Sequence, residues 1–245
     1  MPDLSILMPV YNERATVEEA ISWALAAELP VDSVELVVVD DGSTDGTGDI
    51  LERGDWPDSV RLFKHDRNQG KGAAVRTALD HAQGRWSAIY DADLEYDASD
   101  IAKLMAPLVA GEAEVVFGTR GFESHSAFSF WYVMGNKGVT LVANVLFNSW
   151  LADIMTCHKV MRTDLFRSLN LRRNGFAIEP EITAKLLAAG YGIFEVPVRY
   201  NARGRQEGKK LTAADGVRAI ATLAACRLES KRLAPRMRNR GQRSP

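Results

Sequence analysis

The first half of the chain alternates short apolar runs of strand length with longer segments whose apolar residues recur at helical spacing. The apolar runs are continuous, which is typical of strands buried on both faces. Repeated strand–helix units of this kind predict an α/β fold with a doubly wound, parallel sheet between helices. The expected strands are 4–10, 34–39, 60–63, 86–90 and 115–117, and the expected helices are 15–27, 44–52, 71–82 and 101–109.

The second half is less regular and has no linker long enough to separate a second domain. We expect an aromatic-rich helix over 128–150, a helix over 179–189 that ends at Gly190, a strand over 193–198 and a last helix over 212–232. The chain is therefore predicted to be one domain, 1–230, followed by a disordered tail, 231–245.

Polar residues gather where four of the predicted strands end. The strand ends carry Tyr11-Asn12-Glu13, the run 40–46, the run 68–72 and the run 91–95, whereas the opposite ends carry ordinary turns. In sheets of this type the ligand binds beyond the carboxyl ends of the strands. The pattern predicts one site assembled from several loops.

Two carboxylates, Asp91 and Asp93, follow the fourth strand and point the same way out of the sheet. Adjacent carboxylates repel unless a cation lies between them, and hard oxygen ligands suit Mg²⁺ or Mn²⁺. Glu95 is a candidate third ligand. The alternative is a cluster of acids at a helix N-terminus, which the polar ends of the neighbouring strands make less attractive.

The second strand ends in Asp40-Asp41, followed by Gly-Ser-Thr-Asp-Gly. Turn and capping roles account for Ser43 and Asp45 but not for two acids at the strand end itself. A carboxylate in this position can accept hydrogen bonds from a base or a ribose hydroxyl. A receiver domain also has acidic strand ends, but it is shorter and lacks a second acidic pair of this kind.

Basic residues are candidates for binding phosphate. Gly70-Lys71-Gly72 resembles half of a P-loop, and a lysine at a helix start can contact a diphosphate. Arg120 follows the fifth strand. The segment after the last strand carries Arg203, Arg205, Lys209 and Lys210, which is either a solvated connector or a source of cations for a leaving diphosphate and an anionic acceptor.

Composition is ordinary for a globular chain, with 46% hydrophobic and 25% charged residues, and this excludes a disordered or fibrous protein. The net charge of −2 is unevenly distributed. Six of the 30 Lys and Arg residues lie in 231–245, where there is no acid, so the other 24 face 32 acidic residues and the body carries −8. An acidic body thus carries a basic tail, an asymmetry that needs a reason.

The cysteine and histidine content argues against a disulfide framework and against a metal site built from these residues. Cys157 and Cys226 are too few for a disulfide framework or a zinc site, so reduced thiols are expected. The four histidines have no metal-ligand spacing and are expected on the surface or as hydrogen-bonded core residues: His65, His81, His125 and His158. We expect neither a signal peptide nor a transmembrane span, because no stretch of about 20 residues is apolar throughout.

Five motifs, taken in order, are similar to those of inverting family-2 glycosyltransferases. They are PVYNE, VVDDGSTDGT, NQGKGAA, YDADLEYD and the closing R-x-x-x-x-x-K-K run. More narrowly, the chain resembles the dolichol-phosphate or polyprenyl-phosphate sugar synthases over about 4–227. The resemblance implies a GT-A fold, with a Rossmann-like, mainly parallel sheet sandwiched by helices. It further implies a nucleotide-sugar-binding half, 1–118, and a C-terminal helical acceptor-binding half, 119–230.

The resemblance also implies roles for single residues. It implies that Arg120 binds the acceptor phosphate and that Arg203 and Lys210 bind the donor diphosphate. Asp93 is the carboxylate nearest to the reaction. Metal binding falls to Asp91, Asp93 and Glu95. Contacts with the nucleotide sugar fall to Pro9, Tyr11, Asn12, Glu13, Asp40, Asp41, Lys71, Asp91 and Ala92. Relatives often carry Glu where this chain has Met155, a departure that bears on acceptor or donor preference.

The chemistry implied is transfer of a hexose from GDP-mannose or UDP-glucose to polyprenyl or dolichyl phosphate, with Mg²⁺ or Mn²⁺. A phosphate with a second pKa near ~6 is already a nucleophile at neutral pH, so no Ser–His pair is required. The alternatives are the same donor with a saccharide, lipid or small-molecule hydroxyl acceptor, and an inactive nucleotide-sugar-binding protein. With a membrane-bound acceptor, the basic tail is expected to dock on an anionic membrane surface. We expect a cytoplasmic protein at the membrane periphery, a membrane protein as a candidate partner, and no nucleic acid.

Overall fold

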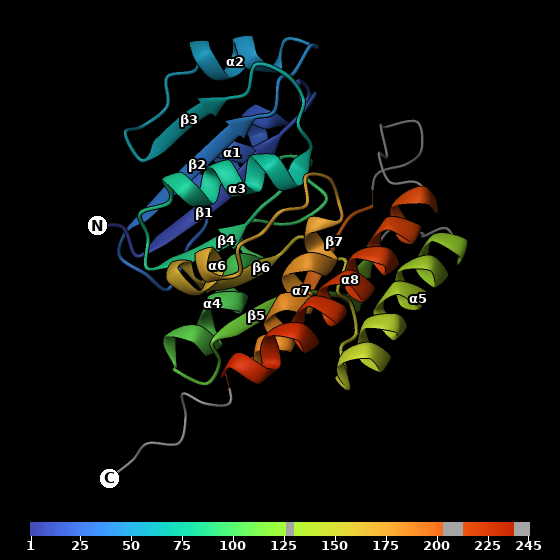
Figure 1. The fold of residues 1–245 in the computed structure, drawn as a ribbon. Helices are drawn as coiled ribbons and strands as arrows, with labels where there is room; N and C mark the ends of the chain where they lie inside the picture. Colours follow the sequence, from blue (N-terminus) through green and yellow to red (C-terminus); the bar gives the residue numbers. More distant parts are fainter. Residues whose placement is uncertain (126–129, 203–212, 238–245) are drawn as a thin grey trace.

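The computed structural model describes residues 1–125, 130–202 and 213–237 and shows a seven-stranded sheet between helices (Figure 1). The strand order is β3-β2-β1-β4-β6-β5-β7. The strands are β1 (Leu4–Val10), β2 (Val34–Asp40), β3 (Val60–Lys64), β4 (Trp86–Ile89), β5 (Val115–His125), β6 (Lys159–Arg162) and β7 (Phe194–Tyr200). The helices are α1 (Val17–Ala26), α2 (Thr47–Arg53), α3 (Lys71–His81), α4 (Asp100–Val109), α5 (Phe130–Phe147), α6 (Thr163–Ser168), α7 (Ile178–Ala189) and α8 (Ala213–Met237).

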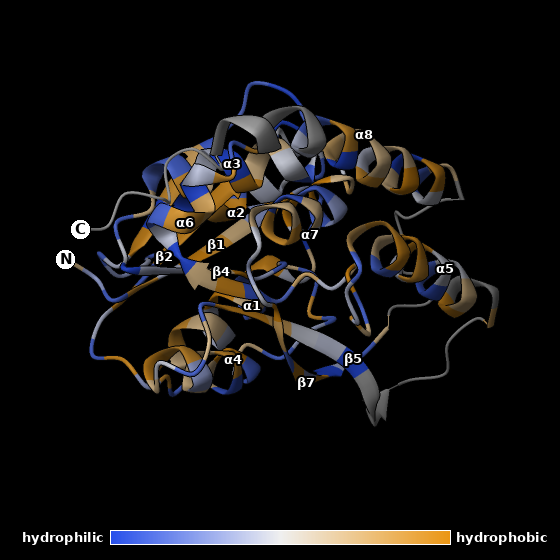
Figure 2. Cartoon of the chain, turned by 60° about the horizontal axis from the view of Figure 1, so that its bottom comes forward, coloured by the Kyte–Doolittle hydropathy of each residue, from blue (hydrophilic) through white to orange (hydrophobic). Residues whose placement is uncertain are grey.

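The first four strands run parallel, as their continuous apolar sequences predict. All seven residues of β1 are buried, and β1 lies between β2 and β4. The chain extends the sheet first toward β3 and then returns past β1 to β4. Because right-handed crossovers that reverse direction place their helices on opposite faces, the sheet is covered on both sides. Figure 2 shows α3 and α6 on one side of the strands and α4 on the other.

The one antiparallel strand in the described sheet is β6, which pairs with both β4 and β5. The sequence analysis does not predict it. Its four residues begin with a lysine and end with an arginine, so the segment contains no apolar run of strand length. β5 and β7 are parallel to each other. The expectation of a mainly parallel α/β sheet is therefore confirmed.

A second, smaller core lies between α5, α7 and α8, which pack against one another. Its buried side chains are Val139, Ala143, Leu151, Ile154, Ala184, Ala219, Leu223 and Cys226. Helix α7 ends as expected, since Gly190 adopts a left-handed conformation with φ of 87°. This helical layer matches the C-terminal helical region expected from the sequence.

Helix α8 continues to Met237, so the backbone of 231–237 is helical where the sequence analysis expects the start of a disordered tail. The segment Lys-Arg-Leu-Ala has high helix propensity and extends the preceding helix in spite of its charge. Residues 238–245 lie outside the described residues. None of the helices in the described ranges is both long and apolar enough to cross a membrane.

Two glycines let the start of α3 approach the loop before α7. Gly70 has φ of 95°, and a Cβ there would lie 2.6 Å from the carbonyl oxygen of Asn174. A Cβ on Gly72 would lie 2.1 Å from the carbonyl oxygen of Arg173. A hydrogen bond stabilises the contact, since the Ala73 N–H donates to Asn174 O at 3.1 Å. The glycines of NQGKG are therefore explained by packing between two loops.

This close approach predicts the effect of a single added methyl group. Gly72→Ala should lower the free energy of unfolding by about 2 kcal/mol, because backbone atoms must move to admit the Cβ. Gly138→Ala is the matched helical control: a Cβ there meets nothing within 4 Å, and it should raise the free energy of unfolding by about 0.7 kcal/mol through helix propensity. Urea denaturation of both variants checks the prediction, and equal stabilities would contradict it.

Candidate active site

A cleft of about 330 Å³ opens at the carboxyl ends of β1, β2 and β4. Parallel pairing brings these ends to one edge of the sheet, so residues far apart in the sequence meet there. The lining residues are Pro9, Val10, Tyr11, Glu13, Asp41, Asn68, Gly70, Lys71, Ala74, Asp91, Ala92, Asp93, Gly175 and Phe176. Of the residues expected from the sequence, eight line the cleft: Pro9, Tyr11, Glu13, Asp41, Lys71, Asp91, Ala92 and Asp93.

Asp41 connects the end of β2 to the loop before α3. Its Oδ2 accepts the N–H of Gly70 at 2.7 Å, and its Oδ1 accepts the N–H of Gln69 at 2.9 Å. His65 Nδ1 lies 2.7 Å from the same Oδ1. A carboxylate that binds two loop N–H groups fixes the loop against the strand. Asp41 thus shapes one wall of the cleft as well as lining it.

Asn12 and Asp40 do not line the cleft but hold the loop after β2. Asn12, with φ of 53°, accepts the N–H of Thr44 at its Oδ1 and donates its own N–H to Ser43 Oγ. Asp40 Oδ1 accepts the N–H of Ser43 at 2.9 Å. The turn-forming alternative considered for the acidic strand end thus accounts for Asp40.

The two carboxylates after β4 both line the cleft. Asp91 is already paired, because its Oδ2 lies 2.7 Å from Lys71 Nζ. Burial works to lower the pKa of Lys71, but the negative charges of Asp91 and Glu179 outweigh it and raise the pKa well above its usual range. Lys71 is therefore a partly buried cation that lies between two acids and lines the cleft.

Glu95 is held away from this pair. The Tyr200 hydroxyl donates to Glu95 Oε2 at 2.7 Å, and the described residues contain no cluster of three or more His, Cys, Asp or Glu side chains that could hold one metal ion. Two carboxylates at a cleft wall still suit Mg²⁺ or Mn²⁺, which typically bind one or two protein carboxylates and complete their shell with substrate phosphates. The donor set fits such an ion through Asp91 and Asp93.

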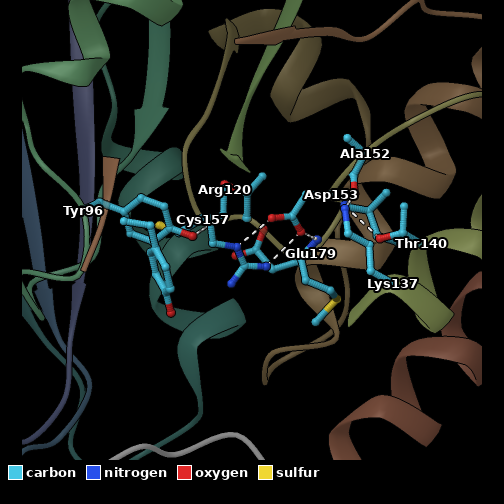
Figure 3. Close-up of polar contacts among 12 residues, drawn as sticks. Tyr96, Arg120, Lys137, Thr140, Ala152, Asp153, Cys157 and Glu179 are labelled. Atoms are coloured by element: carbon cyan, nitrogen blue, oxygen red, sulfur yellow. Dashed lines mark hydrogen bonds and ion pairs between the residues drawn. The ribbon is translucent and has the colours of Figure 1, made fainter. Parts of the chain in front are cut away.

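Arg120 forms a buried, two-pronged ion pair with Asp153 (Figure 3). Its Nε and NH2 donate to the two carboxylate oxygens at 2.6 and 2.8 Å. Burial acts to raise the pKa of Asp153, but Arg120 holds it below its usual range. The guanidinium also lies 5.1 Å from the ring centre of Tyr200. An acceptor phosphate at Arg120 would have to share it with Asp153.

The other predicted phosphate ligands, Arg203 and Lys210, lie outside the described residues, as do Arg205 and Lys209. Three further residues at or beside the cleft are absent from the sequence-based predictions: Gly175, Phe176 and Glu179. Two signals pointed to this region. Asn174-Gly175 is a turn dipeptide just before a predicted helix, and that helix begins with two acids, Glu179 and Glu181, both of which are buried.

The prediction for the histidines is correct for His65 and wrong for His158. His65 is hydrogen-bonded to Asp41 and Thr77. His158 is fully buried, 4.6 Å from the ring of Tyr96, and neither of its ring nitrogens has a hydrogen-bond partner among the described residues. The sequence alone does not reveal that this histidine ring packs in the core without a hydrogen bond. Burial lowers the pKa of His158 to about 4.

Comparison with known proteins places this site in a family. The sequence model of "Glycosyl transferase family 2" matches residues 5–169. The chain is 28% identical over 204 residues to glycosyltransferase AglJ of Haloferax volcanii, covering 82% of this chain and 64% of that protein. It is 27% identical over 206 residues to low-salt glycan biosynthesis hexosyltransferase Agl6 of the same organism, covering 82% and 48%. The chain thus spans less than two thirds of the length of these curated relatives.

Solved structures share the fold. Glucosyl-3-phosphoglycerate synthase of Mycobacterium tuberculosis, in complex with Mn²⁺, uridine-diphosphate and phosphoglyceric acid, superposes with a TM-score of 0.69 at 21% identity, over 92% of this chain and 78% of that one. TarS 1–349 of S. aureus, in complex with UDP-GlcNAc, gives a TM-score of 0.63 at 17% identity, over 91% and 66%. At these identities the likeness shows the fold alone, and the expected GT-A fold is confirmed.

The burial of His158 predicts a pH dependence of stability. As the pH falls below about 6.5 the unfolded chain binds a proton at this ring, whereas the folded protein does so only near pH 4. The stability associated with the neutral ring is therefore present above pH 6.5 and lost as the pH falls to 4, by about 3 kcal/mol. His158→Phe should remove this contribution to the change of unfolding free energy with pH.

The measurement is the difference in unfolding free energy between wild type and His158→Phe at several pH values from 4 to 6.5. Taking the difference cancels the carboxylates that titrate in the same range. His81→Gln is the control, because His81 is exposed and stacks on Phe63, and its slope should match wild type. A difference that stays constant with pH would contradict the prediction, because it would mean that the folded protein binds a proton at His158 as readily as the unfolded chain does.

Proposed function

The chain belongs to glycosyl transferase family 2, and from this premise we propose that it transfers a hexose from GDP-mannose or UDP-glucose to polyprenyl or dolichyl phosphate. The observation that carries the donor side is the cleft, in which an aromatic ring, buried acids and the Asp91-Asp93 pair meet at the strand ends. Pro9, Tyr11 and Glu13 bind the base and ribose in this proposal, with Asp41.

Asp91 and Asp93 would hold Mg²⁺ or Mn²⁺ beside the donor diphosphate. Such an ion would supply positive charge to the leaving group. The presence of Mn²⁺ and uridine-diphosphate in the complex of a structural neighbour supports this choice. Arg203 and Lys210, assigned from the sequence, add positive charge at the same diphosphate.

The acceptor phosphate attacks the anomeric carbon from the face opposite the diphosphate. A carbon–oxygen bond forms to the acceptor as the bond to the diphosphate breaks, so the configuration is inverted. A monophosphate with a second pKa near ~6 needs no general base at neutral pH. The tasks left to the protein are to place two anions side by side and to exclude water, which Arg120 supports on the acceptor side.

Exposed apolar residues on α5 and α8 support a lipid acceptor. Figure 2 shows hydrophobic stretches along both helices. On α5, Phe130, Met134, Leu141 and Val145 recur at spacings that place them along one side of the helix, and Leu141 and Val145 are 62% and 74% exposed. The neighbouring α8 exposes Val217, Ile220 and Leu228, and Trp150 is 92% exposed. We call these eight residues the α5–α8 face.

The α5–α8 face has the chemistry of a helix pair that lies in a membrane interface. Helix α8 leads into the basic tail, whose cations complement anionic lipid headgroups. The proposed location is therefore the cytoplasmic membrane surface, where the polyprenyl chain stays in the bilayer and its phosphate reaches the cleft. A membrane protein partner is compatible with the same surface.

A hydroxyl acceptor is the second candidate, because a structural neighbour holds phosphoglyceric acid beside uridine-diphosphate. Under this alternative the donor chemistry is unchanged, but the acceptor oxygen must lose a proton. Asp93 is the carboxylate for that task. An inactive nucleotide-sugar-binding protein is the third candidate, which the retention of both Asp91 and Asp93 disfavours.

Turnover with an acceptor panel tests the proposal. With Mn²⁺ and UDP-glucose or GDP-mannose, release of nucleoside diphosphate should require polyprenyl phosphate, while polyprenol and phosphoglyceric acid should not replace it. Asp93→Asn should lower the rate at least about 100-fold through loss of a metal ligand. Asp97→Asn is the matched control, because Asp97 is paired with Arg199 and does not line the cleft.

Release that depends on phosphoglyceric acid or on a sugar, and not on polyprenyl phosphate, would establish the hydroxyl-acceptor alternative instead. Tight, metal-dependent nucleotide binding without turnover on any acceptor would establish the inactive binding protein.

Vesicle binding tests the membrane surface separately. The double variant Leu141→Asp/Val145→Asp should bind anionic vesicles at least about tenfold more weakly, since two apolar side chains would be replaced by acids. The matched double variant Leu25→Asp/Val109→Asp changes two exposed apolar residues elsewhere and should bind as wild type does. Removal of residues 238–245 should weaken binding at low salt but leave nucleotide binding intact. Equal binding by both double variants would contradict a role for the α5–α8 face.

A further inference from the structure

A row of four alternating charges runs from the cleft into the core of the domain. Asp91 lines the cleft, and its Oδ2 lies 2.7 Å from Lys71 Nζ. The same Nζ lies 3.1 Å from Glu179 Oε1. Glu179 Oε2 in turn forms an ion pair with Lys159. The four residues come from the loop after β4 and from the starts of α3, α7 and β6, so the row joins four separate elements.

Burial increases along the row. The side chains of Asp91 and Lys71 are 18% and 13% exposed, whereas those of Glu179 and Lys159 are 2% and 0% exposed. Burying a charge costs several kcal/mol unless it is paired, and an apolar pair would fill the same space at lower cost. Glu179 and Lys159 do not line the cleft, and within the row they are linked to Asp91 through Lys71.

Lys71 lies between two acids, so its positive charge is shared between the carboxylates of Asp91 and Glu179. An ammonium that lies between two carboxylates neutralises each of them less than an ammonium with a single partner does. Because Glu179 attracts Lys71, Asp91 is neutralised only in part and retains attraction for a cation on the cleft side. Lys159 limits the effect from the other end, because it offsets the charge of Glu179 and leaves Lys71 in contact with Asp91.

We propose that Glu179 is a positioning residue that sets how strongly Asp91 attracts a divalent cation, by sharing the ammonium of Lys71 with it. The inference rests on the proposed function in one respect, the assignment of Mg²⁺ or Mn²⁺ to Asp91 and Asp93. It does not depend on the identity of the acceptor. If Glu179 served only to tie α7 to β6, its replacement would change stability but not the cation affinity of the folded protein.

The experiment measures the dissociation constant of Mn²⁺ for the full-length protein by electron paramagnetic resonance of the free ion, with and without UDP. Glu179→Gln should weaken Mn²⁺ binding about tenfold, because Lys71 then pairs with Asp91 alone. Lys71→Met should change the affinity for Mn²⁺ alone in the opposite direction, because Asp91 loses its internal cation. Opposite signs from two neighbouring residues are not expected from a general loss of structure.

A second variant covers the case in which Glu179→Gln does not fold, since it leaves Lys159 buried without a carboxylate. Glu179→Gln/Lys159→Met removes both deep charges and keeps the net charge of the row at zero. It should still weaken Mn²⁺ binding, because Lys71 again has one partner. The control is Glu35→Gln, a carboxylate that is also buried and paired, with Arg61 at 3.0 Å, at the opposite end of the sheet. It should leave Mn²⁺ binding as in wild type.

Wild-type affinity for Mn²⁺ in the folded double variant would overturn the inference. Weaker Mn²⁺ binding by Lys71→Met would also overturn it, as would a wild-type protein that binds no Mn²⁺ in the presence of UDP. The proposed function fails in a different way. If Mn²⁺ affinities shift as expected but polyprenyl phosphate is not glycosylated, the role of Glu179 stands and the acceptor assignment falls.

Discussion

The parallel pairing of β1 with β2 on one side and β4 on the other is the constraint on which the site depends. It brings three carboxyl strand ends to one edge, so the residues after each strand share one cleft. The remaining wall depends on a contact that the pairing does not provide. The loop at Asn174 reaches the cleft only because Gly70 and Gly72 leave room for it. Strand order and loop packing thus contribute different parts of the same site.

Much of the cleft can be predicted from sequence because it follows from local rules. Continuous apolar runs identify buried strands, and polar residues directly after those strands must lie at the same edge. Tyr11, Glu13, Asp41 and Asp91 are found in this way. The method errs where a residue near a strand end turns toward its own loop. Asn12 and Asp40 hold the turn that follows β2, and sequence position alone does not separate them from their neighbours that line the cleft.

The missed residues are those whose surroundings depend on distant parts of the chain. β6 contains too few apolar residues to be recognised, although it brings Lys159 to the buried end of the row of charges. Glu179 has the appearance of an ordinary acid in the first turn of a helix, a position that acids favour on electrostatic grounds. Its ion pairs with Lys71 and Lys159 depend on how α7 packs against two other elements. His158 is missed for the same reason, since only the fold encloses its ring.

Charge pairing within the site limits how it can attract its ligands. Lys71, which lines the cleft, lies between Asp91 and Glu179 and is already neutralised by acids; Arg120, which does not line the cleft, is paired with Asp153. A cleft with paired cations and an acidic body around it draws anions weakly. If the chain acts as proposed, the attraction for a donor diphosphate comes from a bound divalent cation and from the segment 203–210, which has four cations and one acid in its sequence. Because four acids and one lysine line the cleft, the proposed function requires the metal and the basic segment to supply the charge that holds the donor.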